Sequence, residues 1–409
     1  MTYQETIDWL FQQFPSYQNI GAKAYKPDLY NVEKLCAIFN NPQKDIKTIH
    51  IAGTNGKGST CSYIASYLTE QDYKVGLFTS PHLQRFTERI RINGQEVSEA
   101  FVVDFVAKIK SENLDYSPSF FEISFVMALE YFKREKVDYA VIETGLGGRL
   151  DATNVIHPIL SIITNIGLEH TNFLGNTIKE IAAEKGGIIK QNTPVVLGTD
   201  NTSVVEVIEQ IAEDKNAELY FSSEDIETPD SILASYLKEN YSTAHKAIEV
   251  LIQRALIQDN SKGISFKQAI KNLTQNTGLK GRMDIVQNSP RIILDAAHNT
   301  DGIAKLLSNF DKEELLIVYG SSNDKDFERI FPLFPKNARF FLTQFSNMRS
   351  AKIEDLKSLS LKHELNAHFF EKVSQALTQA QSTANQEDTI LCFGSFFLLE
   401  DLYDIFSKN

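Results

Sequence analysis

Short apolar runs alternate with helix-like stretches along most of the chain. The run 47–53, KTIHIAG, is rich in β-branched residues and ends in glycine, and apolar residues then recur at helical spacing over 59–71. Strands that alternate with helices predict a mostly parallel sheet covered by helices on both faces. Further strand-like runs occupy 74–79, 137–143, 159–164, 194–198 and 217–221.

The same alternation begins again at residue 291. The stretch 276–290 contains Gly, Asn and Pro without a sustained period, which is typical of a domain boundary. We therefore predict two α/β domains, a larger one at 1–282 and a smaller, Rossmann-like one at 283–409. Ligands of open α/β sheets bind beyond the carboxyl ends of the strands, so the active site is expected in the cleft between the domains. The strand-like runs of the second domain are 291–296, 314–320, 338–343, 366–371 and 388–394.

Composition narrows the class of protein. A length of 409 residues fits two domains, and a net charge of -12 argues against nucleic-acid binding, which requires clustered Lys and Arg. Three widely spaced cysteines predict reduced, buried thiols. The N-terminal segment 1–14 carries acids where a signal peptide would be basic, and no run of roughly eighteen apolar residues occurs. We expect a cytoplasmic protein with no membrane partner.

The sequence GTNGKGST predicts a phosphate-binding loop in the first domain. Its glycines allow backbone N–H groups to face phosphate oxygens, Lys57 supplies a positive charge, and the helix that follows points its N-terminus at the same place. Only two residues separate Gly53 from Gly56, so the spacing departs from the common GxxxxGK[ST] pattern. An ordinary glycine-rich turn is the less favoured alternative. We predict a P-loop ATPase domain whose loop residues are Gly53, Thr54, Asn55, Gly56, Lys57, Gly58, Ser59 and Thr60.

Several polar residues follow other strand-like runs of the first domain. Glu143 is placed like a Walker-B ligand of Mg²⁺, although a capping or salt-bridged Glu would fit equally well. Glu169 and His170 follow the run 159–164, where a lone His is more often structural. Ser119 and Glu122 fit a helix capping box, which favours a structural role for both.

The motif DAAHNTDG, residues 295–302, opens the second domain. It follows a strand-like run and begins a helix, so its Asp, His and Asn are expected to face the phosphate loop across the cleft. A turn that merely ends a strand is an equal alternative.

Seven motifs in order resemble the folylpolyglutamate synthase/dihydrofolate synthase family of the Mur ligase superfamily. The match covers roughly 48–302 and extends weakly through 320–327 and 392–402. The motifs are HIAGTNGKGSTC, FTSPHLQRFTERIRIN, SFFE, VIETGLGGRLDATNVI, ITNIGLEHTNFLG, EKGGIIK and LDAAHNTDG.

The resemblance implies an ATP-dependent ligase of folate biosynthesis and retention. Such an enzyme adds L-glutamate to the γ-carboxylate of tetrahydrofolate polyglutamates, and to dihydropteroate, through an acyl phosphate. The implied partners are ATP, L-glutamate and a folate or dihydropteroate, with two Mg²⁺ ions and a monomeric enzyme.

The resemblance also implies roles for individual residues. Lys57, Lys185 and His298 would be catalytic, and Lys185 would be carbamylated so that it can bind a second Mg²⁺. The metal ligands would be Ser80, Glu143, His170 and Lys185. Asn240, Arg282 and Asp295 would bind ATP with the loop, with Asn240 beside the adenine. The folate residues would be Pro81, His82, Phe86 and Arg89, with Phe86 stacked on the pterin and Arg85 or Arg89 on carboxylates.

Some positions depart from the family pattern. Leu279 and Lys280 stand where Trp-Pro is usual, and Leu237 and Tyr241 flank Asn240 in place of the usual residues. Two other functions remain open. One is a Mur-type amino-acid ligase with a different carboxylate acceptor, and the other is a non-enzymatic ATP-binding switch.

Overall fold

The chain folds into two compact units. The computed structural model describes residues 1–14, 28–112, 114–222, 226–232, 234–258, 264–310 and 314–407. One unit comprises Met1–Ile232 and Leu237–Leu279, and the other comprises Leu233–Tyr236 and Lys280–Asn409. The main segment of the second unit thus begins at Lys280, three residues before the predicted domain start at 283. Among the described residues no helix is long and apolar enough to cross a membrane.

The first unit contains an eight-stranded sheet in the order β4-β3-β2-β5-β1-β6-β7-β8. In this order, each strand from β2 onward pairs in parallel with the next one, up to β8. Strand β3 pairs antiparallel with both β2 and β4. The predicted parallel sheet is confirmed, and the β3–β4 hairpin was not predicted. The strands are β1 (Thr48–Ala52), β2 (Val75–Phe78), β3 (Ile90–Ile92), β4 (Gln95–Glu96), β5 (Tyr139–Glu143), β6 (Leu160–Ile163), β7 (Val195–Leu197) and β8 (Leu219–Phe221).

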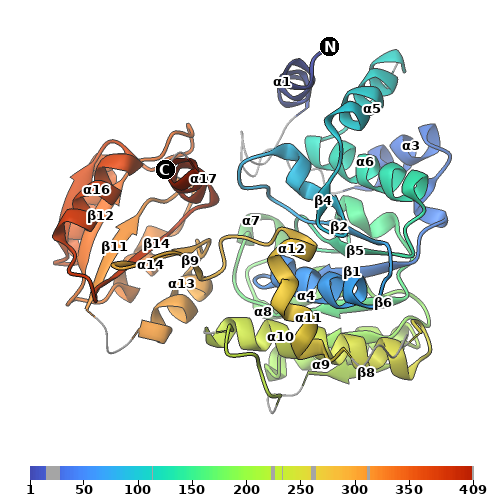
Figure 1. The fold of residues 1–409 in the computed structure, drawn as a ribbon. Coiled ribbons are helices and arrows are strands. Elements are labelled where there is room, and N and C mark those ends of the chain that lie inside the picture. Colours follow the sequence, from blue (N-terminus) through green and yellow to red (C-terminus); the bar gives the residue numbers. More distant parts are fainter. Residues whose placement is uncertain are drawn as a thin grey trace. The chain divides into compact units, whose positions relative to one another are not determined.

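Helices cover both faces of this sheet (Figure 1). Strands β1, β2, β5, β6 and β7 are buried along their whole length, which explains why their sequences are apolar on both sides. The helices are α1 (Tyr3–Gln13), α3 (Tyr30–Ile38), α4 (Lys57–Glu70), α5 (Glu99–Ser111), α6 (Phe120–Glu135), α7 (Thr171–Leu174), α8 (Ile178–Gly186), α9 (Thr202–Asp214), α10 (Ser235–Gln253), α11 (Phe266–Ala269) and α12 (Leu273–Thr277).

The second unit contains a six-stranded sheet in the order β13-β12-β11-β14-β10-β9. Only β9 is antiparallel, and it lies in the segment 276–290 that was predicted to be irregular. The strands are β9 (Asp284–Asn288), β10 (Arg291–Asp295), β11 (Leu315–Tyr319), β12 (Arg339–Thr343), β13 (Asn366–Phe370) and β14 (Thr389–Phe393). The helices are α13 (Thr300–Leu307), α14 (Phe327–Ile330), α15 (Ile353–Lys362), α16 (Val373–Thr383) and α17 (Phe396–Ser407).

The register of the central strands brings their carboxyl ends together. Ile51 of β1 lies beside Glu143 of β5, and Ala52 lies beside Ile163 of β6. The polar residues that follow these three strands therefore meet at one edge of the first sheet. Elsewhere, the buried free thiols of Cys36, Cys61 and Cys392 confirm the prediction for the cysteines.

The capping box at the start of α6 makes a stability prediction. The Glu122 N–H donates to Ser119 Oγ at 3.2 Å, and the Ser119 N–H donates to Glu122 Oε2 at 2.5 Å. Ser119→Ala should lower the free energy of unfolding by about 1 kcal/mol, because a helix-terminal N–H loses its acceptor in a buried setting. Ser119→Asp, which keeps an acceptor, is the control in urea titrations. Equal stability of the two variants would contradict the capping role.

Candidate active site

The phosphate loop joins β1 to α4, and the segment after β6 holds its backbone. The Thr54 N–H donates to the Asn165 carbonyl at 2.8 Å, and the Asn55 N–H donates to Asn165 Oδ1 at 2.9 Å. Helix α4 begins at Lys57, two residues before its predicted start, because Gly56 is its N-cap with φ of 83°, a conformation that favours glycine. The positive end of the α4 dipole therefore lies at the loop.

Two lysines converge on one carbonyl of the loop. Lys57 Nζ donates to the carbonyls of Gly53 at 3.0 Å and Thr54 at 3.3 Å, and Lys185 Nζ donates to the Gly53 carbonyl at 2.8 Å. The pKa of Lys185 is lowered to about 7, mainly by burial and also by the charge of Lys57, whereas Glu169 acts in the opposite direction. Lys185 is thus part of the loop environment although 132 residues separate it from Gly53.

Two glycines of the loop are required by close packing. A Cβ at Gly53 would overlap Thr164 Oγ1, and a Cβ at Gly56 would overlap Asn240 Oδ1. Asn240 lies on α10 and is only 4% exposed, so its side chain packs against the loop. The predicted contact of Asn240 with adenine stays a prediction.

Glu143 lies beside the start of α4. Its Oε2 accepts a hydrogen bond from the Ser80 N–H at 3.0 Å, and a Cβ at Gly58 would lie 3.5 Å from the same oxygen. Pro81 follows Ser80 through a cis peptide bond. The structure therefore brings together Ser80, Glu143 and the phosphate loop, as the Walker-B reading of Glu143 requires.

The donors around the loop fit a hard divalent cation. The hydroxyl oxygens of Ser59 and Thr60 are buried and have no partner among the described residues. Two such oxygens near a carboxylate suit Mg²⁺, which prefers oxygen ligands and keeps several waters. In the described part of the chain no group of three or more His, Cys, Asp or Glu side chains is placed to hold a metal ion.

His170 lies at the start of α7. Its Nε2 is 3.6 Å from Glu169 Oε1, and the two side chains are partly buried. Glu169 also interacts electrostatically with Lys185, so these three residues share one environment. The predicted role of His170 as a metal ligand stays a prediction.

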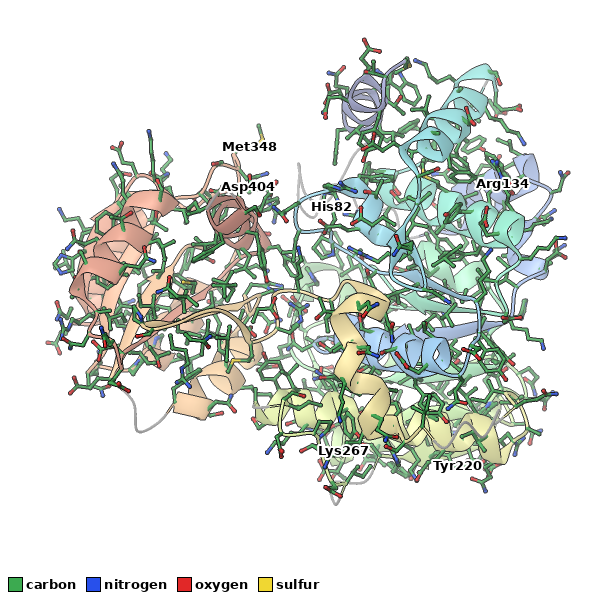
Figure 2. All side chains as sticks on the ribbon, in the orientation of Figure 1. His82, Arg134, Tyr220, Lys267, Met348 and Asp404 are labelled. Carbon is green, nitrogen blue, oxygen red and sulfur yellow. The ribbon has the colours of Figure 1, made fainter. Side chains whose placement is uncertain are left out.

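The predicted folate residues occupy the connection from β2 to β3, where Figure 2 labels His82. Phe86 is 3% exposed and packs edge-on against Phe120 and His82, and its predicted stacking on a pterin stays a prediction. Arg89 is 4% exposed, and its guanidinium lies over Phe120 and donates to His82 Nδ1 at 2.7 Å. The predicted contact of Arg89 with a substrate carboxylate stays a prediction.

Arg85 is also engaged within the protein. Its guanidinium forms an ion pair with Glu96 at 2.6 Å. Since the Arg85 side chain is 61% exposed, solvent weakens this pair.

In the second unit, Asp295 is a buried acceptor at the end of β10. It is 2% exposed and accepts hydrogen bonds from the N–H groups of Met283 and Ala297, at 2.9 and 2.8 Å, and from the Tyr236 hydroxyl. Burial raises the pKa of Asp295, and Arg282 acts in the opposite direction. Asp295 therefore orders the strand end, and its predicted contact with ATP stays a prediction.

His298 and Arg282 share an aromatic neighbour in this unit. The Arg282 guanidinium lies 5.4 Å from the centroid of Phe396, and the His298 ring lies 5.7 Å from it. His298 Nδ1 is 2.8 Å from the Ala296 carbonyl, which can only accept, so Nδ1 carries a proton. The predicted site residues Arg282, Asp295 and His298 thus lie in one region of the second unit.

Sequence reasoning missed two residues that order these sites. Asn165 follows the predicted strand 159–164, so its position at a strand end was a usable signal. Tyr236 bonds Asp295 from a segment 59 residues away, and no local pattern indicates that contact.

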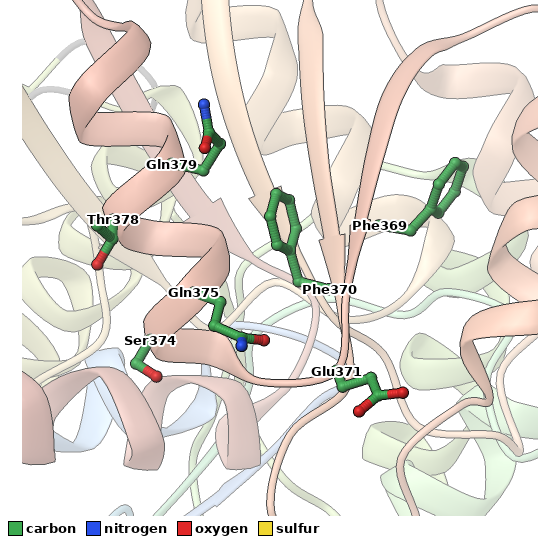
Figure 3. Close-up of a pocket in the computed structure, with 7 residues that line it drawn as sticks. All are labelled: Phe369, Phe370, Glu371, Ser374, Gln375, Thr378 and Gln379. Atoms are coloured by element: carbon green, nitrogen blue, oxygen red, sulfur yellow. The ribbon is translucent and has the colours of Figure 1, made fainter.

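A depression of about 590 Å³ lies elsewhere in the second unit, between edge strand β13 and α16 (Figure 3). None of the predicted site residues lines it. Its walls are Phe369, Phe370, Glu371, Ser374, Gln375, Thr378 and Gln379.

Comparison with known families defines the class of protein. The family model of the Mur ligase middle domain matches residues 51–257, and that of the Mur ligase, glutamate ligase domain matches residues 281–396. The chain is therefore a Mur ligase, which makes it an ATP-dependent ligase. A dihydrofolate synthase/folylpolyglutamate synthase of Bacillus subtilis is 32% identical, and the match covers 98% of each chain. The chain belongs to the dihydrofolate synthase/folylpolyglutamate synthase family.

Solved structures agree with this assignment. FolC from Escherichia coli in complex with DHPP and ADP superimposes with a TM-score of 0.84 at 31% identity, over 98% of each chain. A bifunctional folylpolyglutamate synthase/dihydrofolate synthase with Mn, AMPPNP and L-glutamate bound gives a TM-score of 0.82 at 27% identity, over 100% of this chain and 98% of that one.

Two glycines of the loop should respond differently to alanine. Gly56→Ala should lower the free energy of unfolding by at least about 1 kcal/mol, because φ of 83° strains an L-residue and the new Cβ overlaps Asn240. Gly58→Ala should change it by less than about 1 kcal/mol, since the position is helical and its Cβ would make an ordinary contact with Glu143. Denaturant unfolding of both variants measures this, and a reversed order would contradict the loop geometry.

Proposed function

We propose that this ligase joins the amino group of L-glutamate to the γ-carboxylate of tetrahydrofolate and its polyglutamates, and to the carboxylate of dihydropteroate. Membership of the dihydrofolate synthase/folylpolyglutamate synthase family supports these acceptors. The observation that supports the ATP chemistry most directly is the pair of lysines on the Gly53 carbonyl, beside the loop and Glu143.

The reaction requires activation of the acceptor. A carboxylate is a poor electrophile, so one of its oxygens first attacks the γ-phosphorus of ATP. This step forms an acyl phosphate and releases ADP. The glutamate amine then attacks the acyl carbon, phosphate leaves, and the amine loses a proton. Loop N–H groups and Lys57 stabilise the phosphate charge that accumulates during transfer.

The enzyme uses ATP and a divalent metal. A relative was solved with Mn and AMPPNP, and the Escherichia coli FolC complex contains ADP. We assign Mg²⁺ to Glu143, Ser80 and His170, with the buried hydroxyls of Ser59 and Thr60 as further donors. When bound, the metal neutralises phosphate charge and aligns the phosphate that is transferred.

We further propose that Lys185 is carbamylated and contributes to a second Mg²⁺ site. Carbamylation requires a neutral amine, whose nitrogen attacks CO₂ and releases one proton. A pKa of about 7 leaves much of Lys185 neutral near physiological pH. The product carries a negative charge close to Lys57, so the repulsion between two buried cations becomes an attraction.

The second unit supplies the remaining proposed contacts. Arg282 contacts phosphate, Asp295 orders the nucleotide side, and His298 acts at the glutamate side. Because Nδ1 of His298 carries a proton, Nε2 is the nitrogen that can accept one from the glutamate amine. We also propose that the enzyme acts as a cytoplasmic monomer.

Turnover with defined substrates tests the proposed function. With ATP and Mg²⁺, ADP release should require both L-glutamate and either tetrahydrofolate or dihydropteroate. Lys57→Ala should lower this rate by at least about 100-fold because phosphate charge is no longer neutralised. Lys179→Ala, an exposed lysine on α8, is the control. Turnover with other carboxylate acceptors alone would favour a different ligase, and ATP binding without acceptor-dependent turnover would favour a switch.

Carbamylation of Lys185 predicts a specific signal. In ¹³C-bicarbonate, the wild-type protein and Lys179→Ala should show a carbamate resonance, and Lys185→Ala should lose both the resonance and turnover. In the metal-free protein, carbamate should increase from pH 6 to pH 8, because the neutral amine increases as pH rises through the pKa of about 7. An active enzyme without the resonance would refute the modification.

A further inference from the structure

Thr54 and Asn55, near the start of the phosphate loop, are bonded to the segment that follows β6. The Thr54 N–H donates to the Asn165 carbonyl at 2.8 Å, and the Asn55 N–H donates to Asn165 Oδ1 at 2.9 Å. Each of these N–H groups has one hydrogen, so both are engaged within the protein. The first N–H groups of α4, in contrast, have no partner within the helix, as at any helix N-terminus. The backbone donors that suit phosphate are therefore those of α4.

The side chain of Thr54 contacts the same segment. Its hydroxyl accepts a hydrogen bond from the Gly167 N–H at 2.9 Å and donates its single hydrogen to the Gly167 carbonyl at 3.2 Å. Thr54 is only 5% exposed, so the loss of the hydroxyl would leave two polar backbone groups without partners in a buried setting. One side chain thus satisfies both polar groups of Gly167.

These contacts determine the position of a segment that has no regular structure. Residues 164–170 belong to neither a helix nor a strand, so their own backbone pairing does not fix their path. Thr164 Oγ1 adds a further bond, to the Asn55 carbonyl at 2.7 Å. His170 follows Gly167 by three residues, a span of at most about 11 Å. The contacts with the phosphate loop therefore lie close to His170.

We propose that Thr54 is a positioning residue for the metal site, because its hydroxyl fixes Gly167 and thereby places His170 relative to the phosphate loop. This inference rests on the proposed function, which takes His170 as a ligand of Mg²⁺. It gives Thr54 a role at the metal in place of direct contact with ATP.

The position of Thr54 in the loop suits this role. Mg²⁺ tolerates little deviation from octahedral geometry, so a metal shared by phosphate and protein requires both sets of ligands at fixed places. The loop and α4 would hold the phosphates, whereas His170 comes from a distant part of the sequence. Since 113 residues separate Thr54 from Gly167, their contact ties the proposed protein ligand to the phosphate loop itself.

Mn²⁺ binding to the full-length protein in saturating ADP, measured by EPR, tests the proposal. Thr54→Val keeps the shape of the side chain without the hydroxyl and should lower Mn²⁺ affinity by about 10-fold, as is common for residues that orient metal ligands. Thr54→Ser, which keeps the hydroxyl, should retain most of the affinity. In Thr54→Val, ADP affinity without metal should fall by less than Mn²⁺ affinity.

Thr277 offers a matched control. Its hydroxyl donates to the Leu273 carbonyl at 2.7 Å and accepts from the Leu279 N–H at 3.3 Å, and the residue is 3% exposed. Thr277→Val therefore removes an equivalent buried hydroxyl outside the proposed metal site and should leave Mn²⁺ affinity unchanged. An equal loss of Mn²⁺ affinity in Thr277→Val and Thr54→Val would trace the effect to lost stability and overturn the proposal.

Hydrogen exchange of the metal-free protein gives a second readout. Residues 164–170 should exchange faster in Thr54→Val than in the wild type or Thr54→Ser, because the Gly167 N–H loses its acceptor. Unchanged exchange, with equal losses of ADP and Mn²⁺ affinity, would mean that Thr54 acts on phosphate directly and would overturn the proposal.

Two further variants complete the test. Asn165→Ala removes another bond of the same set and should also weaken Mn²⁺ binding, so it replaces Thr54→Val if that variant does not fold. Wild-type Mn²⁺ affinity in His170→Ala would refute the metal role of His170 in the proposed function. Wild-type affinity in Thr54→Val or, in its place, Asn165→Ala, together with a loss in His170→Ala, would overturn this inference alone.

Discussion

The buried carbonyl of Gly53 accepts hydrogen bonds from Lys57 and Lys185, and the arrangement of the phosphate loop depends on this contact. It joins the loop to α8, so the loop cannot move without breaking bonds to two separate helices. Burial is the main cause of the lowered pKa of Lys185, and the repulsion between the two cations at one carbonyl lowers this pKa as well. A polyanion at the loop, or a negative charge on Lys185, removes this repulsion. The loop thus favours the binding of phosphate and the modification of Lys185 for the same electrostatic reason.

Other buried charges in the protein are held by neutral groups. Asp295 accepts from two backbone N–H groups and one hydroxyl, and Arg89 donates to a neutral imidazole. Such contacts avoid most of the cost of an unpaired buried charge while they fix its position. Each of these contacts therefore fixes the position of a buried charged side chain.

The central strands were predictable because burial on both faces requires a continuous apolar run, as in Tyr139–Glu143. Shorter or edge strands carry no such requirement. Ile90–Ile92 has only three residues, and Asp284–Asn288 is half exposed at a sheet edge, so neither has a clear period. The position of the Phe86 side chain could not be predicted from the sequence either, since a single aromatic residue between polar residues fits a core contact and a ligand contact equally well. The motif order identified the family, but the contact of Lys185 with Gly53 joins residues far apart and has no local signature.

The two sides of the first unit differ in how they present positive charge. Lys57 donates to carbonyls of the phosphate loop, whereas Arg89 donates to the His82 ring. The proposed reaction moves negative charge from the acceptor carboxylate to the leaving ADP. Cations at the phosphate side stabilise the transition state more than the substrate, and a cation at the carboxylate would do the reverse. The positive charge of Lys57 at the phosphate loop therefore lies where the proposed reaction accumulates negative charge.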